Sequence, residues 1–445
     1  MANKPAYNFL KSRSALWTTS ATWLIFIIVV WATINTSIKK DYKTGIMEAD
    51  AKGYYAYLPA VFIYHDLNFA FFNKIENEKY YNPNLSYDYL REHNNKTIDK
   101  YYVGTAICLL PFFLAGHVLT LITGLPADGY SYYYTMMTHL GALFYFILAL
   151  FGLRKLLRSY LIDEKAIALT LIAIVFGTNL FYYVVTEFAM SHLYSFTAIT
   201  WFCLMIRKYF SDHKNKYVVY SALFLGLITL IRPVNLVIVL AIPFLSGSTD
   251  QLISGIRNIL LRKWPLLLAI FSFIFLVSVQ FIIYKISTGS YFVYSYTKEG
   301  FNFTNPQIMN FLFSYRKGMF VYTPLLLLSL TGFIYIYRAS RFQFYALLGF
   351  LLILIYVFSS WHMWFYGGSF SQRVMIDYFA FFTILLAKAL HEIRNNKAKK
   401  MIISLIVLLV IVCQIQTYQY RRMQIHWSDM NKEKYWDVFM RIDKL

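Results

Sequence analysis

The sequence predicts an all-α polytopic membrane protein with about eleven transmembrane helices and a long first extracytoplasmic loop. Of its 445 residues, 58% are hydrophobic and only 14% are charged. Apolar runs of about 20 residues, the length that crosses a bilayer as one helix, recur along the chain. Lys and Arg cluster in the short segments between these runs, which is typical of loops on the cytoplasmic side.

The net charge and the cysteines argue against a nucleic-acid-binding protein and against a disulfide-bonded or metal-binding one. A formal charge of +20 would suggest nucleic-acid binding in a soluble chain, but here the basic loops account for it, so no nucleic-acid partner is expected. Cys108, Cys203 and Cys413 lie within apolar runs, far apart and without metal-ligand spacing. We therefore expect no disulfide framework, no metal site and no cofactor.

The first apolar run orients all the others. It follows Lys4, Lys11 and Arg13 and lacks a small-residue cleavage site, so we expect a membrane helix whose N-terminus is cytoplasmic rather than a cleaved signal peptide. Residues 39–129 then form the first extracytoplasmic loop. The helices are expected at about 19–38, 130–153, 166–184, 217–231, 234–246, 265–285 and 401–418, and in the runs that precede Arg207, Arg338, "SSWHMWFYGGSFSQRVMID" and "HEIRNNKAKK".

Residues 101–124 are apolar enough to cross the membrane, but we expect them to lie at its outer interface. A crossing there would place Arg154, Lys155 and Arg158 outside and would invert every later basic loop. The segment is therefore predicted to form interfacial helices broken at Pro111, and "YYAYLPAVFIYH" is predicted to lie at the interface in the same way.

We interpret residues 1–445 as a single integral membrane domain. The sequence shows no internal repeat and no separate soluble domain. Residues 419–445 are expected to form an amphipathic C-terminal tail on the outer surface, and its expected anchors are Trp427, Tyr435, Trp436 and Phe439.

Charged and aromatic residues gather on the predicted outer face. They come from four segments far apart in the sequence: "EADAKGYY", "TEFAMSH", "SYRKGMFVYTP" and "SSWHMWFYGGSFSQRVMID". A fifth segment, "IRPVN", lies at the break between two short helices. Carboxylates, cations and aromatic rings on one face of a membrane protein indicate a site for an anionic, partly apolar substrate.

The acidic segment supplies the candidate base. A carboxylate just beyond a helix end is ordinarily a solvated juxtamembrane charge. Asp50, however, is fixed between a membrane helix and an interfacial helix, beside an aromatic surface that can seat a sugar ring, where a carboxylate can deprotonate a hydroxyl acceptor. Glu48 is the second candidate for this role. Lys52, Tyr54 and Tyr55 are candidates for contacts to the substrate.

Four cations are candidates for holding an anionic group. Arg373 lies at the outer mouth of a predicted helix and can either snorkel to lipid headgroups or clamp a phosphate with two hydrogen bonds. Arg316 and Lys317 carry the same ambiguity, and a basic pair outside the membrane runs against the positive-inside bias. Arg232 precedes Pro233, which is first a helix breaker and forms a site only by context.

His192, His362 and Trp364 are further candidates for substrate contacts. A histidine at a membrane boundary is more often a hydrogen-bonded structural residue than a ligand or proton carrier, and the separation of these two gives no metal signature. Trp364, like Trp361, is typical of the aromatic belt at the membrane interface.

Taken in order, the segments "EADAKGYYAYLPA", "IRPVN", "RKGMFVYTP" and "WHMWFYGGSFSQR" resemble the GT-C superfamily of membrane glycosyltransferases. There too, a membrane helix precedes a long outer loop with an acidic motif and interfacial helices, and many spans follow. The likeness is greatest to the branch that contains protein O-mannosyltransferases and lipid A aminoarabinose transferases. The Lys-Pro-Pro motif typical of the first loop in that branch is absent, and "YYVGTAICLLPFF" stands in its place.

The resemblance implies inverting transfer of a hexose or pentose from a polyprenyl-phosphate donor to a hydroxyl acceptor on a protein, lipid or glycan. It places this transfer at the outer face of a bacterial inner membrane. The branch uses no nucleotide sugar and usually no metal. By the same resemblance Asp50 is the general base, and Arg373 and Lys317 hold the donor phosphate.

Three other functions stay open. A lipid-linked glycan polymerase or ligase would share the architecture. A flippase or transporter would need charges near mid-membrane and an inverted repeat, and the sequence shows neither. A non-catalytic scaffold would use the outer loop to bind a partner.

Overall fold

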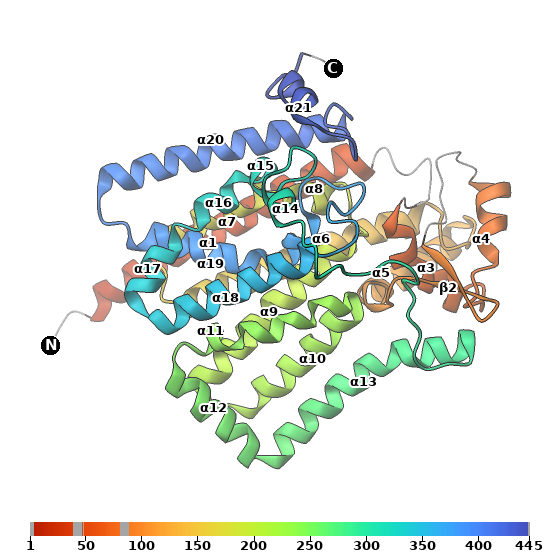
Figure 1. Ribbon diagram of the computed structural model, residues 1–445, viewed down its shortest axis with the longest axis horizontal. Coiled ribbons are helices and arrows are strands. Elements are labelled where there is room, and N and C mark those ends of the chain that lie inside the picture. The colour runs from red at the N-terminus through yellow and green to blue at the C-terminus, as the bar shows by residue number, and fades with distance from the viewer. Residues whose placement is uncertain (1–3, 39–46, 48, 81–88, 444–445) are drawn as a thin grey trace.

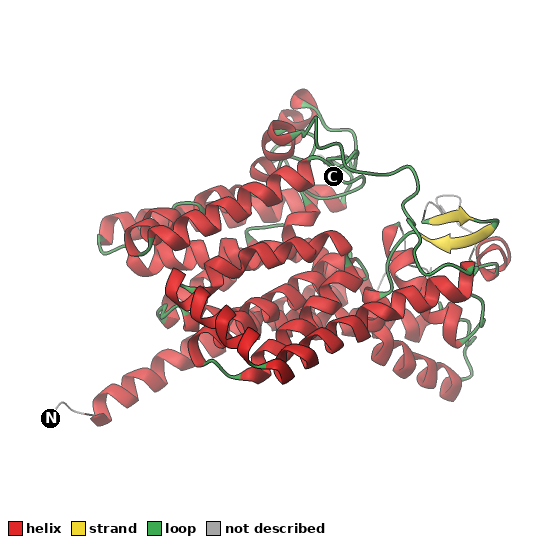
Figure 2. Cartoon of the chain, turned by 60° about the horizontal axis from the view of Figure 1, so that its bottom comes forward, coloured by secondary structure: helices red, strands yellow, loops and turns green. Residues whose placement is uncertain are grey.

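The computed structural model describes residues 4–38, 47, 49–80 and 89–443 and consists mainly of helices (Figure 1). In the first half of the chain these are α1 (Lys4–Thr33), the π-helical η1 (Ile34–Ile38), α3 (Asp50–Phe62), α4 (Phe71–Lys74), η2 (Ile75–Lys79), α5 (Gly104–Thr123), α6 (Tyr132–Ser159), α7 (Glu164–Phe176), α8 (Leu180–Val185), α9 (Ser191–Asp212) and α10 (Asn215–Ile231). The second half holds η3 (Pro233–Ala241), α11 (Ile242–Ser246), α12 (Thr249–Leu261), α13 (Lys263–Thr288), α14 (Ile308–Phe313), α15 (Met319–Tyr322), α16 (Pro324–Ser329), α17 (Gly332–Ala339), α18 (Arg341–Ser359), η4 (Arg373–Tyr378), α19 (Phe379–Glu392), α20 (Asn396–Arg421) and α21 (Lys432–Val438). An antiparallel hairpin of β1 (Leu90–His93) and β2 (Lys96–Asp99) lies at one side of the molecule (Figure 2).

Seven of the described helices are long and apolar enough to cross a membrane, or eight if the bent pair Pro233–Ser246 and Thr249–Leu261 counts as one span. This architecture agrees with the predicted class, an all-α polytopic membrane protein. Every predicted transmembrane segment contains helix, but some of these helices are short, such as α10 and the pair α16 and α17. The count of about eleven spans therefore stays a prediction.

Contacts between helix ends show how the chain runs back and forth. Arg154 of α6 donates to Thr19 Oγ1 of α1 at 2.6 Å. Toward the other end of α1, Ser37 of η1 donates to the carbonyl of Val185, the last residue of α8, at 2.6 Å. Therefore α6 runs antiparallel to α1, whereas α7 and α8 run in the direction of α1. We call the end of the bundle at Thr19 the basic end and the end at Ser37 the loop end.

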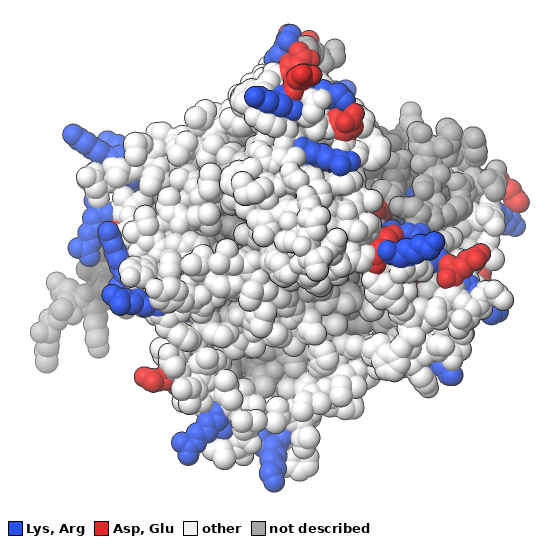
Figure 3. Space-filling model, viewed as in Figure 1, with Lys and Arg blue, Asp and Glu red and all other residues white. Residues whose placement is uncertain are grey.

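Later helices follow the same alternation. His391 in the last turn of α19 lies 2.9 Å from Asp163 at the basic end, and Arg421 of α20 donates to the Thr36 carbonyl at the loop end at 3.3 Å. On the face shown in Figure 3, Lys and Arg gather at the left and lower edges, and a broad belt without charged residues separates them from mixed charges at the right and top. The directions of α1, α6, α7, α8, α19 and α20 are those of the predicted threading. The threading of the other helices, and that the basic end faces the cytoplasm, stay predictions.

The α5 helix corrects one prediction. It runs without interruption over Gly104–Thr123, although a break was predicted at Pro111. Packing along α6 holds the helix across the proline: the Tyr145 hydroxyl donates to the Cys108 carbonyl at 3.1 Å, and Gly116 lies against the start of α6. By length and composition α5 could span a membrane. The contacts with α6 make α5 antiparallel to the first half of α6. Because α6 runs toward the basic end, α5 runs away from it.

Gly104 brings α5 against the loop end of α10. A Cβ at this position would lie 2.3 Å from the backbone nitrogen of Ile231, next to Arg232. Either α5 or the end of α10 would therefore have to move. We predict that Gly104→Ala lowers the free energy of unfolding by about 1–3 kcal/mol, the usual cost of overpacking a core. Thermal unfolding in detergent measures this effect. Gly349→Ala is the control, because nothing lies within 4 Å of a Cβ there, and equal melting temperatures for the two variants would contradict this packing.

The C-terminal tail folds back onto the loop end of the bundle. Its helix covers only α21, so it is shorter than the predicted amphipathic helix. Tyr435, predicted as a membrane anchor, is buried: its ring lies 5.2 Å from that of Tyr315, and its hydroxyl accepts a hydrogen bond from Gln416 at 2.8 Å. Trp427 and Trp436 stay about half exposed.

Candidate functional site

An ion pair at the loop end joins two segments that the sequence separates widely. Asp50, the first residue of α3, and Arg373, the first residue of η4, meet with Nη2 2.5 Å from Oδ2. They are 323 residues apart in the chain. Their side chains keep 17% and 12% of their surface exposed, so the pair is neither fully solvated nor sealed in the core. Both groups therefore remain within reach of a ligand.

The backbone before Asp50 is strained. Ala49 has a φ of 51°, in the left-handed region that costs a non-glycine residue about 1–2 kcal/mol. Asp50 then opens α3, where the positive end of the helix dipole favours a carboxylate. Gly53 lets the Tyr101 segment approach this first turn, because a Cβ there would lie 2.5 Å from the Tyr101 ring. Strain of this kind is typical of functional sites.

Asp50 is ionised at neutral pH. Burial raises the pKa of its carboxyl, but the cations of Arg373 and Lys100, with hydrogen bonds from Tyr101 and Arg373, outweigh burial and hold the pKa below its ordinary value of 3.8. The carboxylate is therefore a hydrogen-bond acceptor and, once it is released from Arg373, a proton acceptor.

Tyrosines form a wall beside the ion pair. The ring centroids of Tyr54 and Tyr101 lie 4.3 Å apart, and Tyr296 meets Tyr101 edge-on at 6.2 Å. Tyr54 is within electrostatic reach both of the ion pair and of Arg232. The wall therefore borders a second group of charged residues as well as the first.

The other two candidates of α3, Lys52 and Tyr55, are buried. Side chains one residue apart on a helix point about 100° apart. Tyr54 consequently faces the ion pair, whereas Tyr55 points into the core of the first loop, where its hydroxyl donates to the Gly129 carbonyl at 2.6 Å.

The second group of charges, which we call the Asp377 cluster, consists of Asp377, His192, Asn235 and Arg232. Asp377 is fully buried four residues after Arg373. Its Oδ1 lies 2.8 Å from His192 Nδ1, and its Oδ2 accepts a hydrogen bond from Asn235 Nδ2 at 2.6 Å. The Nε of Arg232 lies 3.8 Å from Oδ2. The cluster thus joins α9, the corner after α10, and η4.

The corner at Arg232 follows from the proline after it. Pro233 cannot continue the hydrogen bonding of α10, and the residue before a proline avoids the helical region. Arg232 is accordingly extended, with φ −152° and ψ 106°, and η3 begins directly after it. From this corner both Arg232 and Asn235 reach Asp377.

Lys317 and Arg316 take different places. Lys317 is 1% exposed and donates through Nζ to the carbonyl of Ser369, in the loop that leads to Arg373. Burial, with Arg316 and Arg373 nearby, lowers the pKa of its ammonium to about 7. Arg316 is held toward the tail, where it donates to the Ser428 carbonyl at 2.9 Å.

Two predicted site residues, His362 and Trp364, lie in the loop before Arg373. His362 is exposed, and its backbone nitrogen donates to the Gly300 carbonyl at 2.9 Å. Trp364 packs on Phe365, with ring centroids 5.7 Å apart. Glu48 lies outside the described residues.

Four residues of this region are not among the site residues predicted from the sequence: Asp377, Asn235, Tyr101 and Tyr296. For Asp377 and Asn235 a signal was present, because polar groups at the edge of apolar helices are costly and often functional. The two tyrosines carried no signal, since the chain contains 39 tyrosines.

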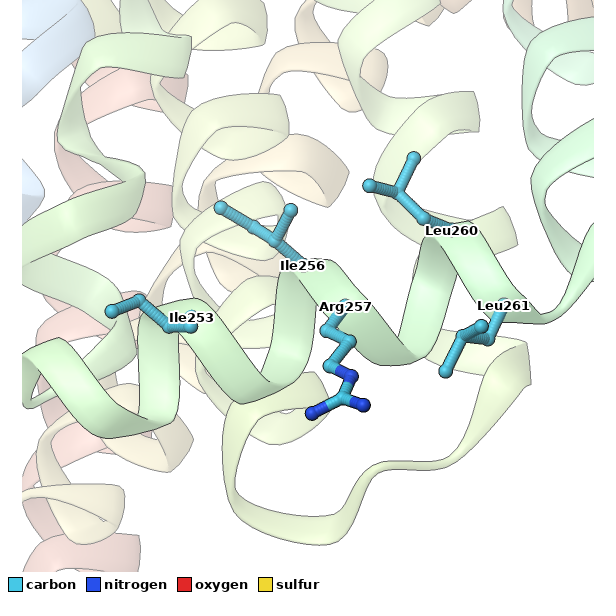
Figure 4. A pocket seen from close by; sticks show the side chains of 5 residues that line it. All are labelled: Ile253, Ile256, Arg257, Leu260 and Leu261. Atoms are coloured by element: carbon cyan, nitrogen blue, oxygen red, sulfur yellow. The ribbon is translucent and has the colours of Figure 1, made fainter.

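The described part of the chain shows no metal site, and a surface hollow lies away from the ion pair. None of its His, Cys, Asp and Glu side chains form a group of three placed as metal ligands. A hollow on α12 is lined by Ile253, Ile256, Arg257, Leu260 and Leu261 (Figure 4). It lies at the basic end, where Arg262 after α12 donates to Asn215 at the start of α10, and is therefore remote from the ion pair.

No model of a known protein family matches the sequence, and no curated protein matches it. Among solved structures, the chain is similar to the archaeal oligosaccharyltransferase AglB from Archaeoglobus fulgidus in complex with an inhibitory peptide and a dolichol-phosphate, with a TM-score of 0.45 and 12% identity over 94% of this chain and 57% of that one. It is also similar to the apo form of the Archaeoglobus fulgidus oligosaccharyltransferase, with a TM-score of 0.45 and 13% identity over 95% and 58%. The chain thus spans little more than half the length of these proteins.

Proposed function

We propose that the protein is a membrane glycosyltransferase that moves a sugar from a polyprenyl-phosphate donor to a hydroxyl acceptor, with inversion, at the loop end of the bundle. The observation that carries this proposal is the Asp50–Arg373 ion pair beside the tyrosine wall. It puts a carboxylate and a guanidinium together where membrane helices end. A base for the acceptor and a cation for the phosphate are the two groups that such a transfer needs.

Arg373 has spare hydrogen-bonding capacity for a phosphate. Its Nε is buried without a hydrogen-bond partner among the described residues, and its Nη1 approaches the Met190 sulfur at 4.0 Å. A guanidinium can bind a phosphate through two parallel hydrogen bonds. Arg373 would therefore stabilise the charge that develops on the leaving phosphate, with Lys317 as a second cation.

Asp50 would accept the proton of the acceptor hydroxyl. The acceptor oxygen attacks the anomeric carbon, the bond from that carbon to the phosphate oxygen breaks, and its electron pair leaves with the polyprenyl phosphate. Because the phosphate leaves as an ionised group, it needs no general acid. A single displacement of this kind inverts the anomeric centre.

The ion pair must open before this step. Arg373 Nη2 holds Asp50 Oδ2 at 2.5 Å, and a carboxylate paired in this way is a weak base. A donor phosphate bound to Arg373 competes for the same N–H groups and releases the carboxylate toward the acceptor. Donor binding should therefore precede productive acceptor binding.

The efficiency of transfer should fall as the pH rises above neutrality, because Lys317 then loses its proton. The pKa of its ammonium is lowered to about 7, so the cation is present below that pH and is lost above it. We predict that kcat/KM for the donor falls by up to about tenfold per pH unit above 7. Lys317→Arg, which stays charged, should remove the decline. A wild-type profile without any decline above neutrality would contradict the role of Lys317.

A panel of donors tests the proposed function. Purified protein in nanodiscs is incubated with polyprenyl phosphates that carry different sugars, with and without hydroxyl acceptors, and released polyprenyl phosphate is measured by mass spectrometry. Consumption of one donor with transfer to an acceptor would support a glycosyltransferase. If no donor is consumed but the lipids cross the bilayer of proteoliposomes, the protein is a flippase and the proposal is wrong.

A further inference from the structure

We propose that Asp377 is a positioning residue that holds Arg232 in place as a further contact for the phosphate, beside Arg373 and Lys317, an inference that rests on the proposed function. Arg232 touches the phosphate, and Asp377 acts through Arg232. The two guanidiniums, Arg232 and Arg373, then approach the phosphate from two separate elements.

Asp377 fixes one edge of Arg232 by two routes. The direct route is the 3.8 Å approach of Arg232 Nε to Asp377 Oδ2. The second route passes through His192: its Nδ1 lies 2.8 Å from Asp377 Oδ1 and donates there, and Arg232 Nη1 lies against the ring, 3.3 Å from Nε2 and 3.4 Å from Nδ1. The carboxylate thus holds the histidine ring in place, and the ring in turn packs against the guanidinium.

Asn235 keeps Asp377 in one orientation. Its Nδ2 donates to Asp377 Oδ2 at 2.6 Å and to Ser195 Oγ at 3.2 Å, while its Oδ1 accepts from the Tyr378 hydroxyl at 3.0 Å. All these side chains are buried. A buried polar network in which each member is satisfied holds a single arrangement.

Arg232 lies near the same tyrosines that border the ion pair. Among the described residues its Nη2 has no hydrogen-bond partner, and the side chain keeps 16% of its surface exposed. The tyrosines within its electrostatic reach include Tyr54 and Tyr296, which also form the wall beside Asp50. Arg232 and the ion pair therefore border the same group of tyrosines.

The charge of the reacting phosphate gives this second guanidinium its role. The sugar-linked donor is a phosphodiester with a single negative charge. The polyprenyl phosphate that leaves is a monoester, which approaches two charges near neutral pH. A further positioned cation consequently stabilises the leaving group more than the donor, and its loss should lower kcat more than it raises the KM for the donor.

Kinetics and binding of three variants test the inference: Asp377→Asn, Arg232→Gln and the double variant. We expect each single variant to lower kcat about tenfold or more, and to weaken binding of polyprenyl phosphate in nanodiscs by a similar factor, with a smaller change in donor KM. Because Asp377 acts through Arg232, the double variant should lose no more than Arg232→Gln alone. The matched control is Asp163→Asn, which alters a carboxylate–histidine pair of the basic end, with His391 at 2.9 Å, and should change neither quantity.

Several outcomes would overturn the inference. They are unchanged kcat and phosphate binding in Asp377→Asn, losses that multiply in the double variant, and a wild-type protein that binds no polyprenyl phosphate. If Asp377→Asn does not fold, Asn235→Ala takes its place, with a smaller loss expected, and wild-type kcat in that variant would also overturn the inference. A wild-type protein that binds polyprenyl phosphate but transfers no sugar would instead refute the proposed function, and the binding comparison would still test Arg232 and Asp377.

Discussion

Replacing Asp50 with Asn is expected to lower the rate of sugar transfer by about 10²–10⁴-fold, the usual contribution of a positioned general base. The substitution keeps the shape of the side chain but removes its ability to take a proton. Binding of polyprenyl phosphate should be retained or become tighter, because Arg373 is no longer held in an ion pair at 2.5 Å. Initial rates with the donor identified in the panel, and the Kd for polyprenyl phosphate, measure the two effects separately.

The matched control for Asp50→Asn is Glu164→Gln. Glu164 pairs with Arg158 at 2.5 Å, and its side chain is 17% exposed, as is that of Asp50, but this pair lies at the basic end. We expect Glu164→Gln to transfer sugar at the wild-type rate. Transfer at the wild-type rate by Asp50→Asn would show that Asp50 is not the base.

Replacing Arg373 with Gln is expected to reduce both phosphate binding and stability. Loss of a charged, two-pronged contact should weaken binding of polyprenyl phosphate by roughly 100-fold. The Asp50 carboxylate would also lose its partner in a place that is mostly shielded from water, which should lower the free energy of unfolding by about 2 kcal/mol or more. Titration with polyprenyl phosphate and thermal unfolding in the same detergent measure the two effects.

The double variant Asp50→Asn with Arg373→Gln separates the two roles of Arg373. Removal of both charges leaves no unpaired carboxylate, so stability should partly recover relative to Arg373→Gln, whereas phosphate binding and transfer should not. Arg158→Gln serves as the control at the basic end. Wild-type affinity for polyprenyl phosphate in Arg373→Gln would rule out Arg373 as the phosphate contact.

The membrane class could be predicted because apolar length and loop charge are properties of short segments. At Pro111 such reasoning from a short segment gives the wrong result, a broken helix. A proline weakens a helix locally, but the packing of α5 along α6 is a tertiary effect, and it holds the helix together. Tyr435 is a similar case, because an amphipathic pattern predicts an apolar contact without saying whether lipid or Tyr315 provides it.

Individual residues of the site could be predicted from the sequence, but the contacts between them could not. Asp50 and Arg373 could each be selected from their local setting, but their contact spans 323 residues. Tyr54 and Tyr55 are neighbours in one sequence segment, so the local sequence does not distinguish them. Only the helical geometry of α3, which points the two side chains in different directions, separates their roles. Asp377 gains its importance from contact with His192, Asn235 and Arg232, and no spacing in the sequence encodes that contact.

The position of the phosphate in a complex with polyprenyl phosphate tests the proposed site most directly. It can be measured by cryo-electron microscopy of the protein in nanodiscs that contain this lipid. The predicted result is a phosphate within hydrogen-bond distance of Arg373, with the Asp50 carboxylate released from the guanidinium. A phosphate bound elsewhere, with the Asp50–Arg373 pair still at 2.5 Å, would contradict it.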